Sequence, residues 1–248
     1  MRLLSLFSLI AIFTIATSAQ ELPREWIDPD TGHRVIRLSD EPGSASLYFH
    51  QNAYTPDGEK LIITTPSGLS TINLKTRVIE KVVDGRVNVI ITGKKTGDIY
   101  YTKAGVVYAT NLKTKATREV AKLPPRTSVA SVNADETLLA GIIDEGPPPQ
   151  ATTPGAPPRG DSYPGKGEMM ERRLAERRPL RLITINTSNG EVKTLLKGTD
   201  WYNHIQFSPT DPNLLMFCHE GPWHKVDRTW TIKTDGSSLT QIHHRTMN

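Results

Sequence analysis

Short runs of Ile, Val, Thr, Leu and Tyr follow one another along most of the chain, and polar turns separate them. The runs are bounded by Asp-Gly, Ser-Gly and Asn-Gly pairs, which are typical of turns between β-strands. Helical periodicity is almost absent. The pattern therefore predicts an all-β protein built from many short strands.

A repeated phrase organises these strands. It starts at Tyr54 (YTPDGEKLIITTPSGLSTINLKTRVIEKV), at Lys94 and at Phe207, and VNADETLLAGI together with LRLITINTSNGEVKTLL supplies a fourth copy. The turn asparagines Asn73 and Asn111 lie 38 positions apart, close to the roughly 40 to 45 residues of a four-stranded propeller blade. A β-sandwich would also contain short strands but would not explain the repeat. We therefore predict a β-propeller with about four blades in this chain.

The fourth copy is interrupted between residues 146 and 179. This insertion is first rich in Pro and Gly and then forms a predicted short helix from 168 to 178. Proline cannot supply the hydrogen bonds of a β-ladder, so the segment must leave the sheet. The helix, which carries Arg172, Arg173, Arg177 and Arg178 alongside Glu171 and Glu176, is either a solvated helix stabilised by i,i+4 charge pairs or a basic lid over an anionic substrate.

The first 19 residues are typical of a signal peptide, with one cation at Arg2, an apolar run and small residues before Gln20. Residues 20–248 are predicted to be the N-terminal part of a single β-propeller domain, in which the segment HRVIRLSD at 33–40 would complete a last blade. Cys218 is the only cysteine, which excludes an internal disulfide. We expect an exported, periplasmic protein, with no membrane span after the leader.

Composition and motifs exclude several classes of function. A net charge of +4 without a basic, aromatic stripe does not favour nucleic acid. No Gly-x-Ser-x-Gly elbow and no phosphate-binding glycine loop are present. His219 and His224 are five residues apart across Gly221-Pro222, which rules out a helical zinc motif. The DPDTG segment at 28–32 lacks the further ligands of a calcium loop and predicts a turn.

The candidate site residues lie in loops and junctions at similar blade positions. The segment CHEGPWHKVDRTW, residues 218–230, predicts a charged, aromatic loop between two strands, where binding residues often lie. His50 and Gln51 precede the first copy, and Trp201 and His204 precede the last one. We expect these side chains to face a common channel.

The blocks WIDPDTGHRVIRLS, LYFHQNAYTPDG and DWYNHIQFSPTDPNLLMFCHEGPWHKVDRTWTIKTDG resemble the oligogalacturonate lyases, seven-bladed propeller enzymes of pectin breakdown. The resemblance implies β-elimination of short galacturonate oligomers assisted by a divalent metal, manganese. It also implies that Arg228 is catalytic and binds a substrate carboxylate. His50, Gln51, Trp201, His204 and His219 are the expected substrate-binding residues.

In this family the proton-abstracting histidine and the metal ligands are expected in later blades. The resemblance therefore assigns no metal ligand to this chain, and we expect residues 20–248 to have little lyase activity by themselves. Members of the family are often cytoplasmic, so the leader is a departure. The alternative is a non-catalytic, TolB-like propeller that binds a protein or a saccharide; the oligomeric state stays open.

Overall fold

A computed structural model describes residues 23–148 and 165–246. The predicted signal peptide lies outside the described residues. The chain divides into two compact units, Met1–Leu38 and Ser39–Asn248. Among the described residues, no helix combines the length and the apolar character needed to cross a membrane.

The described part of the first unit is a hairpin of β1 (Glu25–Ile27) and β2 (Arg34–Ile36). Asp28 closes its turn, because its carboxylate accepts hydrogen bonds from both the amide and the hydroxyl of Thr31, at 2.8 and 2.7 Å. The predicted turn at 28–32 is confirmed. Within the described residues, the HRVIRLSD segment pairs with β1 of its own hairpin, and its role in a last blade stays a prediction.

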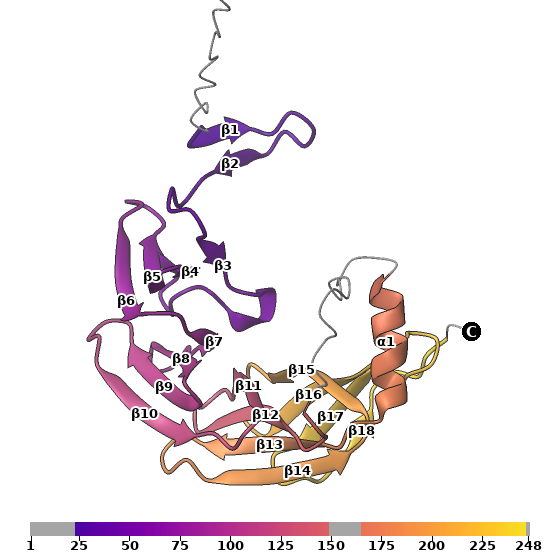
Figure 1. The fold of residues 1–248 in the computed structure, drawn as a ribbon. Coiled ribbons are helices and arrows are strands. Elements are labelled where there is room, and N and C mark those ends of the chain that lie inside the picture. The colour runs from indigo at the N-terminus through magenta and orange to yellow at the C-terminus, as the bar shows by residue number, and fades with distance from the viewer. Residues whose placement is uncertain (1–22, 149–164, 247–248) are drawn as a thin grey trace, which may run out of the picture. The chain divides into compact units, whose positions relative to one another are not determined.

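The second unit contains four antiparallel sheets of four strands each. In every sheet each strand pairs with the next one along the chain, as in a propeller blade (Figure 1). The first two sheets are β3 (Ala45–Ser46), β4 (Lys60–Thr65), β5 (Gly68–Asn73) and β6 (Ile79–Asp84), then β7 (Asn88–Thr92), β8 (Asp98–Lys103), β9 (Val106–Asn111) and β10 (Thr117–Lys122). The last two are β11 (Thr127–Val132), β12 (Leu138–Asp144), β13 (Leu180–Asn186) and β14 (Val192–Gly198), then β15 (Trp201–Phe207), β16 (Leu214–Glu220), β17 (Thr229–Lys233) and β18 (Thr240–Gln241).

The repeated phrase corresponds to a repeated turn. The side-chain oxygen of Asn73 accepts hydrogen bonds from the amides two and three residues later, and those of Asn111 and Asn186 do the same. Each turn then closes on a residue with left-handed backbone, namely Arg77, Lys115 and Gly190. Asn suits this position because its short side chain bonds to the backbone two residues on. The sequence repeat therefore reflects one local structure in three sheets.

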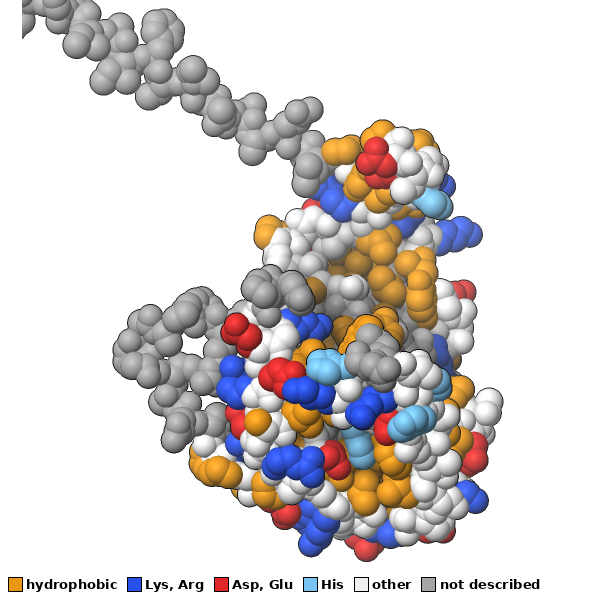
Figure 2. All heavy atoms as spheres, turned by 90° about the vertical axis from the view of Figure 1, so that its right-hand side faces the viewer, with side chains coloured by type: hydrophobic (Ala, Val, Ile, Leu, Met, Phe, Trp, Pro, Cys, Tyr) orange, Lys and Arg blue, Asp and Glu red, His pale blue; other side chains and the backbone are white. Residues whose placement is uncertain are grey.

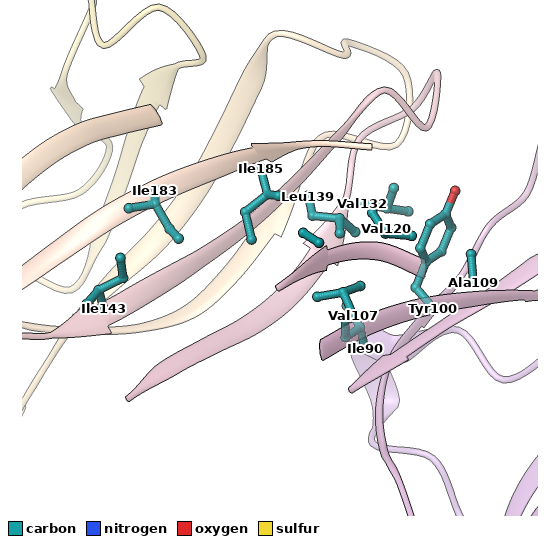
Figure 3. Close-up of a cluster of buried hydrophobic side chains, with 11 residues drawn as sticks. Ile90, Tyr100, Val107, Ala109, Val120, Val132, Leu139, Ile143, Ile183 and Ile185 are labelled. Atoms are coloured by element: carbon teal, nitrogen blue, oxygen red, sulfur yellow. The ribbon is translucent and has the colours of Figure 1, made fainter. Parts of the chain in front are cut away.

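Apolar side chains fill the spaces between consecutive sheets. Figure 3 shows one such cluster, in which Tyr100 and Val107 of the second sheet lie with Leu139, Ile183 and Ile185 of the third. Similar clusters join the first sheet to the second and the third to the fourth. The first strands also follow one another in space, since β7 contacts β11 and β11 contacts β15. Each sheet thus covers the apolar face of its neighbour, as repeat architectures require.

The insertion between β12 and β13 contains the helix α1 (Gly165–Glu176). The predicted bounds of 168–178 were wrong at both ends by a few residues. The helix ends before Arg177 because that residue has left-handed backbone, with φ of 45°, and Pro179 follows. Residues 149–164 of the insertion lie outside the described residues.

Candidate functional site

The loop between β16 and β17, residues 221–228, ends at Arg228, and its guanidinium pairs with Glu220 at the end of β16. The Nη2 atom of Arg228 lies 2.6 Å from Oε1 of Glu220. The side chain of Glu220 is only 7% exposed. A buried carboxylate needs a partner because water no longer stabilises its charge. Glu220 is not among the site residues that the sequence predicts, although it lies within the predicted loop segment 218–230.

His204 approaches the same carboxylate from β15. Its Nε2 atom lies 3.0 Å from Oε2 of Glu220, although this oxygen has no aligned hydrogen-bond donor among the described residues. The register of β15 against β16 shifts between Asn203 and Gln206, and His204 has a left-handed φ of 48°. Such bulges redirect a side chain and are frequent next to functional sites.

His50 lies in the 3-10 turn η1 (Phe49–Gln51), far from His204 in the sequence. Burial lowers the pKa of His50, and the neighbouring His204 lowers that pKa further. The two histidines are therefore close enough to interact electrostatically. This supports the expectation that the first and last sheets contribute side chains to one place.

Gln51 has a structural role in this turn. Its amide nitrogen donates to the carbonyl of Val89 in β7 at 2.6 Å, and its amide oxygen accepts from the backbone of Tyr48 at 2.8 Å. Both ends of the side chain are thus used within the protein. Its predicted role in substrate binding stays a prediction.

His219 lies on the other face of β16, because adjacent strand residues point to opposite faces. Its ring stacks on Trp230 with 4.7 Å between centroids, and it also contacts Tyr202 and Phe217. Burial lowers the pKa of His219, and Asp200, whose Oδ2 lies 4.0 Å from Nδ1, opposes this shift. His219 therefore belongs to an aromatic cluster rather than to the group around Glu220.

Trp201 pairs with Glu220 in the register of β15 and β16. Its indole lies under the guanidinium of Arg173 from α1, whose Cζ is 4.3 Å from the ring centroid. The structure thus brings Arg228 and His204 together at Glu220, with His50 within electrostatic reach of His204, and places Trp201 against Arg173 of the helix.

A cavity of about 230 Å³ lies beside Arg228. Trp223, His243 and Arg245 also line it, and the guanidinium of Arg228 stands 5.2 Å from the centre of the exposed Trp223 ring. On the face shown in Figure 2, histidine side chains lie among basic and acidic ones. Two arginines and an aromatic ring around a small cavity suit an anionic ligand with a flat apolar face.

Comparisons with known proteins bear on this arrangement. Residues 170–247 match the family model described as oligogalacturonate lyase. Over 231 residues the chain is 28% identical to the oligogalacturonate lyase of Dickeya dadantii, an alignment that covers 87% of this chain and 56% of that protein. It is also 40% identical over 63 residues to an oligogalacturonide lyase of Pectobacterium atrosepticum, covering 25% and 16% of the two chains.

Solved structures agree with these sequence matches. An oligogalacturonate lyase in complex with manganese superposes with a TM-score of 0.72 at 25% identity, covering 88% of this chain and 58% of the other. This chain is a homologue of the oligogalacturonate lyases. The predicted resemblance and the predicted β-propeller class are confirmed. The chain spans a little over half the length of the Dickeya dadantii protein and of the solved manganese-bound lyase.

The family match coincides with the site. Its residues 170–247 contain Trp201, His204, Glu220 and Arg228. A TolB protein from Agrobacterium tumefaciens also superposes, with a TM-score of 0.56 and 14% identity over 86% of this chain and 66% of that one. At that identity the TolB likeness shows the fold alone.

The manganese of the solved oligogalacturonate lyase raises the question of a metal site among the described residues. In residues 23–148 and 165–246, no group of three or more His, Cys, Asp or Glu side chains is arranged to hold a metal ion. His204 and Glu220 are close, but the neighbour that completes their contacts is the cation Arg228. The described residues therefore do not fit a metal, and we assign no metal-dependent step to them.

Proposed function

We propose that this protein is an oligogalacturonate lyase, and that the described residues form the wall of its active site that binds a uronate carboxylate. The observation that carries the proposal is Arg228, which Glu220 fixes beside a cavity lined by Trp223 and Arg245. The homology to oligogalacturonate lyases in sequence and structure supports the same substrate.

The chemistry gives Arg228 a defined task. In a β-elimination a base removes the proton at C5 of the uronate, a double bond forms between C4 and C5, and the glycosidic oxygen leaves C4 and gains a proton. Negative charge develops on the carboxylate at C5 in the transition state. A guanidinium that donates two parallel hydrogen bonds to this carboxylate stabilises that charge and so favours proton removal.

Other parts of the proposal concern the whole protein. We propose manganese as its metal because a solved homologue is in complex with manganese, with ligands other than the described residues. We also propose a periplasmic location on the basis of the predicted leader. N-terminal sequencing of the protein from a periplasmic extract should begin at Gln20 if the leader is cleaved there.

Calorimetry with digalacturonate tests the binding wall directly. We expect the purified protein to bind digalacturonate and not the neutral digalactoside, and Arg228→Ala to weaken binding by about tenfold or more, as for the loss of a charged hydrogen bond. Arg86→Ala, at an exposed position, is the matched control. Equal affinity for the two disaccharides would contradict the proposal and favour the TolB-like alternative.

Product formation tests the reaction itself. The unsaturated uronate absorbs in the ultraviolet, so the reaction can be followed with and without added manganese. We expect little product from the 248-residue chain alone. Appreciable manganese-dependent product would show that this chain contains a complete catalytic set, against our assignment of its residues to the binding wall only.

A further inference from the structure

Glu220 is a buried carboxylate whose surroundings need an explanation. It lies at the end of β16, its side chain is 7% exposed, and both of its neighbours are side chains of the candidate site. Oε1 pairs with Nη2 of Arg228 at 2.6 Å, and Oε2 faces Nε2 of His204 at 3.0 Å. A buried ion pair is seldom a gain in stability over apolar packing, because both charges lose their hydration.

Glu136, a second glutamate that is buried in the described part of the chain, shows what a structural carboxylate looks like in this fold. Its oxygens accept hydrogen bonds from the amides of Lys95 and Thr96, and from the hydroxyls of Thr96 and Tyr100. These hydrogen bonds link the third sheet to the second, and each carboxylate oxygen of Glu136 has at least one donor. Glu220 differs, since Oε2 has no hydrogen-bond donor among the described residues.

We propose that Glu220 is a positioning residue that fixes the guanidinium of Arg228 at the wall of the cavity for a uronate carboxylate. The inference rests on the proposed function and deepens it. Glu220 is suited to this task because it ends β16, opposite Trp201 of β15, and β16 is an inner strand of its sheet, paired with both β15 and β17. The arginine lies at the end of a loop, and loops hold side chains less firmly than strands do.

The ion pair uses one edge of the guanidinium. Nη2 is engaged by Glu220, and the guanidinium also makes a hydrogen bond with the thiol of Cys218. The side chain also lines the cavity and stands over Trp223. Because an arginine offers five N–H donors in a fixed plane, holding one of them sets the direction of the others. Glu220 thereby orients the donors that remain for the ligand.

Two substitutions separate position from charge. Glu220→Asp keeps the negative charge but withdraws the carboxylate by one methylene, so that it no longer reaches Nη2. Glu220→Gln keeps the length and a carbonyl acceptor but removes the charge. If position matters, Glu220→Asp weakens digalacturonate binding on the order of tenfold, and Glu220→Gln weakens it less. Wild-type affinity in Glu220→Asp would overturn the proposal.

A double-mutant cycle shows whether the effect passes through the arginine. We expect Glu220→Asp to change the affinity of the Arg228→Ala protein by less than about twofold, since the group it positions is gone. Independent, additive losses would mean that Glu220 only supports the sheet, and would overturn the proposal. Glu136→Asp is the matched control: it should lower the melting temperature and leave the affinity unchanged.

A readout without sugar keeps this inference separate from the proposed function. Phenylglyoxal modifies arginine side chains, and mass spectrometry measures its rate at Arg228. We expect faster modification of Arg228 in Glu220→Asp than in the wild type, and no change in Glu136→Asp. If the wild type binds no digalacturonate, the proposed function fails, whereas an unchanged rate at Arg228 would overturn the positioning role by itself.

Discussion

Arg173 of α1 places its guanidinium carbon 4.3 Å from the centre of the Trp201 ring, and this contact ties the helix of the insertion to the first strand of the last sheet. None of the helix residues is buried. Ion pairs add to this contact: Glu171 of the helix pairs with Lys225 at 2.8 Å, and Arg177, which follows the helix, pairs with Asp200 at 2.8 Å. The helix is therefore attached by exposed charge contacts beside the loop that carries Arg228.

This attachment predicts a specific effect of Arg173→Ala. The cation–π contact contributes about 0.5 to 1 kcal/mol at an exposed site, so the global melting temperature should hardly change. Amide hydrogen exchange within residues 165–176 should become faster, because the helix opens more often from the sheet. Arg172→Ala is the control, since its partner Glu176 lies in the same helix at 3.9 Å. Equal acceleration in both variants would mean that the contact with Trp201 does not hold the helix.

The blade pattern was predictable from the sequence because it depends on local chemistry. Asn73 and Asn111 close their turns with their own side chains, and the short apolar strands pair with their neighbours along the chain. The helix of the insertion was also predicted, but its end depends on the left-handed backbone of Arg177. The helix is attached through charge contacts. Such contacts are consistent with both predicted alternatives, a solvated helix with charge pairs and a basic lid.

The site was predictable only in part. His204 is predicted as an unusual residue of a blade junction, and the resemblance to the lyases implies Arg228; the two do share Glu220. His219 is separated from this group because adjacent strand residues point to opposite faces, and this alternation can be predicted from the sequence. The position of His204 depends on a bulge in β15, which the sequence does not reveal. Glu220 was missed because one carboxylate at the end of an apolar strand gives no distinct signal of burial.

Glu136 should be a main determinant of stability between the second and third sheets. It is 6% exposed, and its carboxylate accepts the amide hydrogen bonds of Lys95 and Thr96 at 2.6 and 3.1 Å. Glu136→Ala leaves these donors without an acceptor, which should cost about 3 kcal/mol in the free energy of unfolding. Urea denaturation measures this loss.

The control for this substitution is Glu191→Ala, at an exposed position in the turn before β14, which should change stability by less than about 0.5 kcal/mol. A similar small effect of Glu136→Ala would mean that water replaces the carboxylate between the two sheets.

Replacement of Gly141 and of Gly167 by alanine should have different effects on the stability of the protein. A Cβ at Gly141 in β12 would lie 2.1 Å from the backbone oxygen of Ser128, whereas a Cβ at Gly167 in α1 would meet nothing within 4 Å. Gly141→Ala should therefore lower stability by about 2 to 3 kcal/mol through overpacking. Gly167→Ala should leave it unchanged or raise it by up to about 1 kcal/mol through helix propensity. Thermal and urea unfolding of both variants measure the difference, and equal effects would contradict the close approach of β11 to β12.

His219 should make stability depend on pH below neutrality. Burial among Tyr202, Phe217 and Trp230 lowers the pKa of its imidazole, with Asp200 only partly opposing this shift. The folded protein then binds the proton less readily than the unfolded chain, in which the pKa of histidine is about 6.5. Stability is thus retained above that pH and is lost as the pH falls through it, because protonation favours the unfolded chain.

The measurement is the free energy of unfolding in urea at a series of pH values from about 7.5 to 5.5, spanning the unfolded-state pKa of histidine. His219→Asn should be less stable at every pH, since it loses the stack on Trp230, but its free energy should fall less steeply as the pH is lowered. His224→Asn, at an exposed position, should keep the wild-type slope. Burial also lowers the pKa of His50, so part of the slope should persist in His219→Asn. An unchanged slope in His219→Asn would show that this ring is protonated in the folded protein, with Asp200 as its counter-charge.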